Sequence, residues 1–297
     1  MELPKEVPDN YLLEELQKRL EEKNACLQIQ SDLVAELEAL NARLRDSERV
    51  KSGFLSNIRN EIYNPLTSII GLSDQMFNGS EIDITKIKHI ASLINKEAFR
   101  LDYQLRNIFS AAEIEAGEVM LQPAMVNIDD LIQSQILYFQ FKSNEHGIVV
   151  EYQSTNGKHF KTDGAMLQSI VMNLLANAIE FSPRDKKVII NCQFENNALV
   201  LKIQDFGKGI ETKDHKHVFE RFKQLDTGTT KTHLGHGLGL SIVQEFAFTL
   251  GGGIKIDSEV NKQTIVTLTI PELPMDQVSD GYSSNGQEII FGEEEVL

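Results

Sequence analysis

A long stretch without glycine or proline, residues 11–50, limits most strongly what this chain can fold into. It is rich in Leu, Glu, Lys and Arg, and its leucines recur at heptad-like spacing in two sets that are out of register. The pattern predicts a long helix that pairs with a second helix in a parallel coiled coil, with a stutter near residues 28–32. The alternative is an amphipathic helix on its own domain, but no globular core precedes it. The two sets are Leu13, Leu16, Leu20 and Leu27, and Leu33, Leu37, Leu40 and Leu44.

The helical pattern continues from residue 48 to about Met76 and breaks at the polar residues 78–80. It resumes at Asp83, a predicted N-cap, and runs to Ala116. Two long helices joined by a short polar turn make an antiparallel hairpin. Because one hairpin leaves an apolar stripe exposed on each helix, we expect two copies of the chain to form a four-helix bundle.

Short β-like runs alternate with helical segments after Gly117 and predict a mixed α+β domain. Two adjacent runs, 187–194 and 198–204, indicate a β-hairpin. Beyond Pro271 the chain becomes polar and then acidic, which predicts a flexible tail or linker, and its abrupt end is compatible with a protein that continues. The other predicted strands are 119–121, 148–152, 253–257 and 264–270, and the predicted helices are 128–144, 163–181 and 238–250.

The composition excludes several classes of protein. Hydrophobic residues make up 41% and charged residues 25% of the chain, no apolar run approaches the roughly 18 residues of a membrane span, and the N-terminus lacks a signal peptide. Two cysteines, Cys26 and Cys192, match neither a disulfide framework nor a metal site, so we expect a cytoplasmic protein. The formal net charge of −15 argues against general nucleic-acid binding, so any phosphate must be bound locally.

Two asparagines in "NLLANAIEF", Asn173 and Asn177, are the first candidates for chemistry. They lie four residues apart in a helical segment and therefore share one helix face. Their amides can offer oxygen to a hard cation and NH₂ to a phosphate. Taken alone, such a pair is more often ordinary polarity on a helix surface.

Two glycine-rich stretches follow. In "QDFGKGI", Asp205 ends an apolar strand, where its carboxylate can accept a hydrogen bond from an exocyclic amine, and Gly207 and Gly209 let the backbone approach a planar ring. By itself this pattern is a weak signal, and the alternative is a simple turn. In "GHGLGLSIV", glycines open a helix and present backbone amides to phosphate. This second stretch fits neither a Walker loop nor a dinucleotide fingerprint.

In combination and in this order, "NLLANAIEF", "QDFGKGI", "VFERFKQ" and "GHGLGLSIV" resemble the N box, first glycine box, F box and second glycine box of sensor histidine kinases. "GFLSNIRNEIYNPLTSIIGLSDQM" is similar to the phosphoacceptor helix of that family, and "EAGEVMLQPAMVNIDDLI" to the junction after its dimerisation hairpin. The resemblance covers residues 48–271. It implies a coiled-coil signalling helix (1–47), a dimerisation and phosphoacceptor-like hairpin (48–117), an α+β ATP-binding sandwich of the GHKL type (118–272) and a tail or linker (273–297).

The resemblance also implies roles for single residues. Asn177 would ligate Mg²⁺, and Asn173 would support the ion or its water. Asp205 would read the adenine amine of ATP, beside a wall formed by Gly207 and Gly209. Phe219 and Phe222 would anchor the near end of a lid over the nucleotide, and Gly235, Gly237, Leu238 and Gly239 would form the box that bends the lid and contacts the phosphates.

Glu180 is the first departure from the family pattern. The family usually has a basic residue there, three places after Asn177, and a glutamate would repel the phosphates of ATP. Lys231, in the predicted lid, is the candidate to compensate. The alternative is that Glu180 faces solvent and only weakens nucleotide binding.

Asn60 is the larger departure. The family places a histidine directly before Glu61, and its imidazole attacks the γ-phosphate of ATP. The amide nitrogen of asparagine has its lone pair delocalised into the carbonyl, so it cannot act as the nucleophile. None of the seven histidines elsewhere lies in a matching motif. In the family, the residue at Glu61 is a general base and the polar group at Asn64 orients water for dephosphorylation, while Pro65 predicts a hinge.

Three functions are compatible with these residues. The first is a degenerate histidine kinase, a homodimer that binds Mg-ATP and acts on a response regulator or another histidine kinase. The second is an active enzyme: a response-regulator phosphatase using Asn64, a kinase acting on a partner's histidine, or a kinase into which Asn60 was introduced. The third, which Glu180 favours, is a dimeric scaffold with a vestigial ATP pocket.

Overall fold

The computed structural model describes residues 9–78, 83–155, 157–184, 186–222 and 237–274. They fall into two units, one ending at Asn60 and one beginning at Glu61. Helix α1 (Asp9–Asn78) crosses that boundary without interruption and contains Pro65. Within the described stretches, no helix has the length and apolar character needed to cross a membrane.

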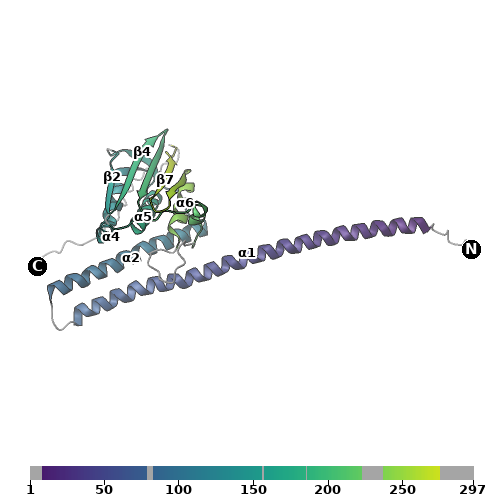
Figure 1. Ribbon diagram of the computed structural model, residues 1–297, viewed down its shortest axis with the longest axis horizontal. Coiled ribbons are helices and arrows are strands. Elements are labelled where there is room, and N and C mark those ends of the chain that lie inside the picture. Colours follow the sequence, from purple (N-terminus) through teal and green to yellow (C-terminus); the bar gives the residue numbers. More distant parts are fainter. Residues whose placement is uncertain (1–8, 79–82, 156, 185, 223–236, 275–297) are drawn as a thin grey trace, which may run out of the picture. The chain divides into compact units, whose positions relative to one another are not determined.

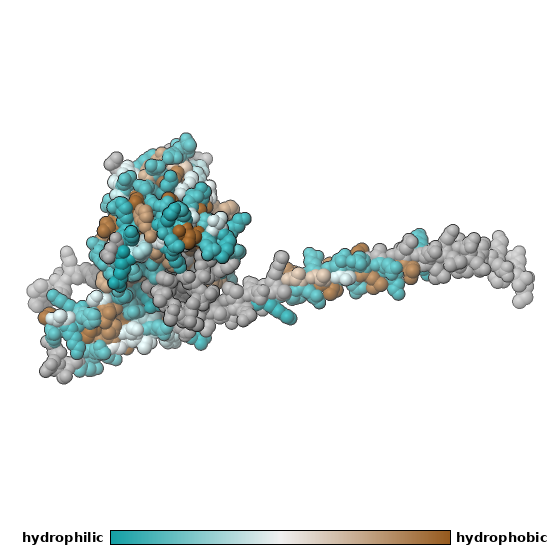
Figure 2. Space-filling view, in the orientation of Figure 1, coloured by the Kyte–Doolittle hydropathy of each residue, from teal (hydrophilic) through white to brown (hydrophobic). Residues whose placement is uncertain are grey.

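In the first unit, the described leucines of α1 are exposed in the single chain. Leu20, Leu27, Leu33, Leu37 and Leu40 each expose between 52% and 62% of their surface. Figure 2 shows hydrophobic residues among hydrophilic ones along the helix. The predicted helix is confirmed, and the coiled coil that would cover these leucines stays a prediction.

In the second unit, helix α2 (Ile84–Ala116) begins and ends where the sequence predicts. The Asp83 side chain accepts a hydrogen bond from the Thr85 N–H (2.9 Å), which is an N-cap. At the other end, Gly117 adopts the left-handed conformation (φ 68°), and its N–H bonds back to the last turn of the helix.

The rest of the second unit is built on a five-stranded sheet of order β2-β4-β5-β7-β6 (Figure 1). β2 pairs in parallel with β4, and the other neighbours are antiparallel. Asn196 and Asn197, both at positive φ, turn β4 into β5, so the predicted hairpin is confirmed. Two further strands, β1 (Pro123–Asn127) and β3 (His159–Asp163), form a separate antiparallel pair. The sheet strands are β2 (Val149–Gln153), β4 (Lys187–Glu195), β5 (Ala198–Asp205), β6 (Gly253–Glu259) and β7 (Gln263–Pro271).

Helices cover one face of this sheet. α5 (Gly164–Phe181) packs against β5 and lies between α3 (Ile128–Tyr138) and α6 (Gly239–Thr249). Alternate residues of the central strands point toward these helices and are buried, as expected when one face of a sheet is covered. Together they form the core, whose fully buried side chains include Ile170, Leu175, Ile179, Ile190, Leu201 and Ile203.

Two sequence predictions were wrong in detail. Residues 119–121 form no strand, and the chain first pairs at Pro123, where β3 offers a partner. The helix predicted over 128–144 is two helices, because the backbone departs from helical geometry at Phe139 before α4 (Gln140–His146) begins. Phe139 is 1% exposed, and its ring contacts Phe99 and Tyr103 of α2. Strand β3 and the short 3₁₀ helices η1 (Thr212–Asp214) and η2 (His217–Phe219) were not predicted.

Candidate nucleotide-binding site

The two asparagines on α5 occupy different environments. Asn173 is completely buried, whereas Asn177 is half-buried. The Asn173 Oδ1 accepts a hydrogen bond from the Tyr103 hydroxyl of α2 (3.0 Å), and its Nδ2 donates to the Asn107 Oδ1 (2.9 Å) and the Ser169 carbonyl (3.0 Å). The amide of Asn173 is therefore occupied by the protein. Asn177 makes no side-chain hydrogen bond within the described ranges, so its amide oxygen is available to a cation.

Tyr103, Asn107 and Asn173 form a group that we call the α2 clamp. Burial raises the pKa of Tyr103 to about 12, so its hydroxyl stays protonated and donates at neutral pH. The Tyr103 ring meets Phe139 edge-on at 6.1 Å, and the Phe99 ring of α2 lies 5.5 Å from Phe139. α2 thus joins the rest of the second unit through both hydrogen bonds and aromatic contacts.

Asp205 lies at the end of β5 with 8% of its surface exposed. Burial raises its pKa to about 6, although a hydrogen bond from the Gly207 N–H to Oδ1 (2.9 Å) opposes the rise. At neutral pH the side chain is therefore a buried carboxylate, and it receives one hydrogen bond from the described residues. Such a group has the capacity to accept a hydrogen bond from a ligand amine.

Both glycines of the first glycine box are required by the protein's own packing. A Cβ on Gly207 would lie 2.3 Å from the Phe181 carbonyl oxygen. A Cβ on Gly209, which has a φ of +69°, would lie 2.4 Å from the Glu259 carbonyl oxygen. The box therefore fixes the turn after β5 between the end of α5 and the β6–β7 turn, whatever ligand it also contacts.

The second glycine box meets the F box and the α2 clamp. The Phe222 N–H donates to the Gly237 carbonyl (3.0 Å), and Phe222 itself has an unusual positive φ of 65°. Leu238 is buried, and a Cβ on Gly239 would lie 2.7 Å from the Asn173 Oδ1. Three of the predicted boxes are thus in contact. Phe219 is half-buried in η2, while Lys231 and Gly235 lie outside the described residues.

Glu180 does not face solvent, so that alternative is wrong. Its carboxylate lies 2.7 Å from the Nζ of Lys142 on α4, and the two side chains are 9% and 12% exposed. Lys142 therefore neutralises the negative charge that the sequence places beside the predicted phosphate site. Sequence reasoning missed Lys142 because no local pattern links α4 to the end of α5.

The residues of the predicted acceptor motif lie on α1. The structure describes the backbone of Asn60 and Glu61 but not their side chains. Asn64 is exposed and Pro65 is buried. The described residues contain no cluster of three or more His, Cys, Asp and Glu side chains that could hold a metal ion. An amide such as that of Asn177 fits Mg²⁺ where substrate phosphates and water supply the other ligands.

Comparison with known proteins identifies the domain. Residues 162–274 match the family model described as histidine kinase-, DNA gyrase B-, and HSP90-like ATPase. The chain is 28% identical over 247 residues to hybrid signal transduction histidine kinase D of Dictyostelium discoideum, covering 80% of this chain and 16% of that protein. It is 26% identical over 262 residues to the circadian input-output histidine kinase CikA of Thermosynechococcus vestitus, covering 87% of this chain and 35% of that protein. The chain therefore spans about a third or less of the length of these relatives.

Solved structures share the fold. The histidine kinase AdeS of Acinetobacter baumannii superposes with a TM-score of 0.50 at 21% identity, over 72% of this chain and 98% of that chain. Full-length ShkA, solved in complex with AMPPNP, gives a TM-score of 0.54 at 20% identity, over 73% of this chain and 45% of that chain. At these identities the likeness establishes the fold alone.

We predict that Lys142→Ala destabilises the ATP-binding domain, because it removes the counter-charge of a carboxylate that is 9% exposed. The loss in free energy of unfolding should be roughly 3–5 kcal/mol, as found when one partner of a buried ion pair is removed. Urea unfolding followed by circular dichroism measures it. The double variant Lys142→Met/Glu180→Gln should recover most of the loss.

The matched control is Lys187→Ala, which removes the exposed Lys187–Glu151 pair, whose side chains are 46% and 49% exposed. This change should cost less than about 1 kcal/mol. Equal losses of unfolding free energy for Lys142→Ala and Lys187→Ala would show that the Lys142–Glu180 pair stabilises the protein no more than an exposed ion pair does.

Proposed function

We propose that the chain is a degenerate member of the sensor histidine kinase family that binds Mg-ATP and signals without phosphorylating residue 60. The observation that carries the proposal is the asparagine at position 60, where the family has its phosphoacceptor histidine. The carboxamide of Asn60 lacks the basic, in-plane lone pair with which an imidazole accepts a phosphoryl group. Phosphoryl transfer to this position is therefore excluded by chemistry.

The residues of the ATPase domain fit a nucleotide. The buried carboxylate of Asp205 would accept a hydrogen bond from the adenine amine, and the half-buried Asn177 would hold Mg²⁺ together with the phosphates. Gly237, Leu238 and Gly239 precede and open α6, where backbone N–H groups favour phosphate. When bound, ATP would supply a transferable γ-phosphoryl group. The charge of Glu180 does not oppose this binding, because Lys142 pairs with it.

The partners follow from the N-terminal helices. The exposed leucines of α1 support a homodimer held by a coiled coil and a four-helix bundle. We propose that the dimer regulates a response regulator or another histidine kinase through nucleotide-dependent changes of conformation. The cysteine usage supports a cytoplasmic location.

A second candidate function is dephosphorylation of a response regulator, and the exposure of Asn64 favours it. An exposed carboxamide on α1 can orient a water molecule toward a phosphoryl group on a docked partner. This activity needs neither a histidine at position 60 nor transfer of phosphate from ATP.

Incubation with γ-labelled ATP and Mg²⁺ tests the first proposal. We predict no acid-labile label on the purified chain, because residue 60 offers no nucleophile. Asn60→His is the informative companion variant: label on this variant alone would attribute the missing activity to that one side chain. Acid-labile label on the unmodified chain would contradict the proposal.

Calorimetry with ATP and Mg²⁺ tests nucleotide binding. We predict that Asp205→Asn weakens ATP binding about tenfold at pH 7.5, because the amide cannot replace a charged acceptor. The pKa of Asp205 is raised to about 6, so its side chain is ionised above that pH. The negative charge is lost by protonation as the pH falls through 6. The ratio of the ATP affinity of the unmodified chain to that of Asp205→Asn should therefore fall as the pH is lowered from 7.5 to 5.5.

Comparing the two proteins at each pH cancels the titration of ATP itself. Absent or millimolar binding by the unmodified chain would favour the scaffold function instead. An advantage over Asp205→Asn that stays constant across the pH range would contradict the assignment of Asp205 as the adenine acceptor.

The phosphatase function predicts faster loss of phosphate from a phosphorylated response regulator in the presence of the chain. We expect Asn64→Ala to abolish the acceleration, because alanine cannot orient water. Ser68→Ala, one turn further along the same helix, is the control and should leave the acceleration unchanged. An acceleration that survives Asn64→Ala would remove the basis for this candidate.

A further inference from the structure

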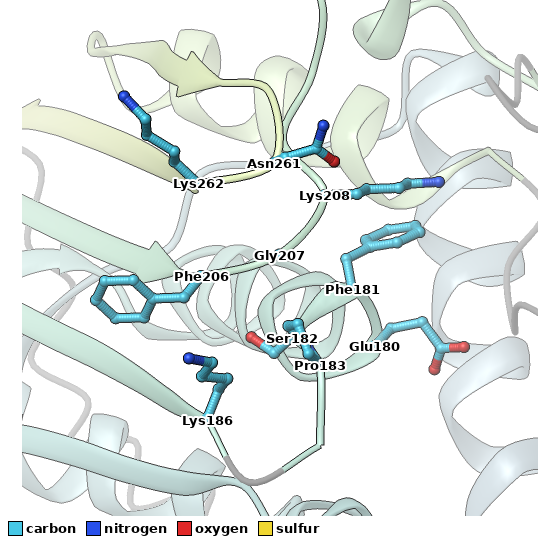
Figure 3. Close-up of a pocket in the computed structure, with 10 residues that line it drawn as sticks. All are labelled: Glu180, Phe181, Ser182, Pro183, Lys186, Phe206, Gly207, Lys208, Asn261 and Lys262. Atoms are coloured by element: carbon cyan, nitrogen blue, oxygen red, sulfur yellow. The ribbon is translucent and has the colours of Figure 1, made fainter.

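A cavity of about 590 Å³ opens at the C-terminal end of α5. It is bounded by the segment that joins α5 to β4, the turn after β5 and the β6–β7 turn (Figure 3). The Asn261 N–H donates to the Lys208 carbonyl (2.8 Å), so the last two of these segments are joined by a hydrogen bond. The volume lies within the usual range for small-molecule sites.

This cavity is not the predicted nucleotide site. Of the residues assigned to ATP, only Glu180 and Gly207 line it. Asp205, Asn177 and the second glycine box do not. The two sites therefore share the Gly207 wall, and Gly207 donates a hydrogen bond to Asp205 on the nucleotide side.

Lysines give the cavity a charge opposite to that of the whole chain. Lys186, Lys208 and Lys262 line it, while the chain as a whole carries a formal charge of −15. Lys186 is exposed and has no ion-pair partner within the described ranges. Lys208 lies 5.0 Å from the centre of the Phe181 ring, and Lys262 pairs with Glu259. The acidic lining residue, Glu180, is neutralised by Lys142 from outside the cavity.

A buried hydroxyl also lines the cavity. Ser182 is 6% exposed, and its Oγ has no hydrogen-bond partner in the described structure. A buried polar group without a partner carries a free-energy cost, so it needs an explanation. Figure 3 shows the Ser182 side chain directed toward the side of the cavity where Phe206 and Lys186 lie. An acceptor oxygen of a ligand there would satisfy the hydroxyl.

We propose that this cavity binds a small organic phosphate. Lys186 and the Ser182 hydroxyl would hold the phosphate, because ionised acceptors form the stronger hydrogen bonds, and Lys208 and Lys262 would add positive charge around it. The Phe206 ring and Pro183 supply an apolar surface for the organic part. A ligand held here would contact the turn that follows Asp205 and so act beside the nucleotide without occupying its site.

Phenyl phosphate is a suitable probe, measured by calorimetry on the whole chain at low ionic strength. We expect it to bind both without nucleotide and in the presence of a saturating non-hydrolysable ATP analogue. The double variant Lys186→Gln/Lys262→Gln should weaken binding at least about tenfold, and Ser182→Ala about threefold. Lys202→Gln, a change of an exposed lysine on β5, should leave the affinity unchanged.

Ser182→Ala should not lower the free energy of unfolding, because no described protein group pairs with this hydroxyl. Three outcomes would overturn the proposal. The first is no binding of phenyl phosphate, or equal binding to the lysine variant. The second is competition by the ATP analogue, which would assign the probe to the nucleotide site. The third is equally tight binding of inorganic phosphate, which would leave the organic part without a role. ATP affinity measured on the same preparation separates these failures from a failure of the nucleotide site.

Discussion

The hydrogen bonds around Asn173 hold together the parts of the second unit on which its function depends. One buried amide connects Tyr103 and Asn107 of α2 with α5, and its oxygen lies against Gly239 at the start of α6. A completely buried amide is stable only when its polar atoms have partners, and this one finds them on a neighbouring helix. The position of α2 is thus fixed by the same residue that anchors the predicted N box.

Some polar residues of α5 contact other helices of the protein, and one is available to a ligand. Asn173 and Glu180 are engaged by α2 and α4, while Asn177 is the member of the set with an amide available for an ion. Residues three and four apart lie on one side of a helix. Their side chains still point in slightly different directions, so one can contact the protein while its neighbour is available to a ligand. The charge of Glu180 is a local departure from the family pattern that Lys142 compensates from another helix.

Sequence reasoning succeeded where the determinants are local. Caps such as Asp83, the turn at Asn196 and Asn197, and the alternation of buried residues in strands depend on neighbours in the chain, so the main strands and helices were predicted. It failed where contacts between segments far apart in the chain determine the local structure. The break at Phe139 lies where this residue packs against α2, a distant segment, and the Lys142 ion pair joins segments that no motif connects. The protein partners of Asn173 and Glu180 could therefore not be predicted without the structure.

The environment of Asp205 bears on whether the proposed nucleotide site is functional. Burial raises its pKa to about 6, so at neutral pH the fold keeps a carboxylate ionised where ionisation is disfavoured. The Gly207 N–H satisfies part of its capacity to accept hydrogen bonds. A scaffold gains nothing from this arrangement, because an apolar residue of similar size would be more stable there. A domain that binds adenine gains a charged acceptor in a dry site, where hydrogen bonds to a ligand are strongest. The burial of the Asp205 carboxylate thus supports the proposal that this domain binds nucleotide.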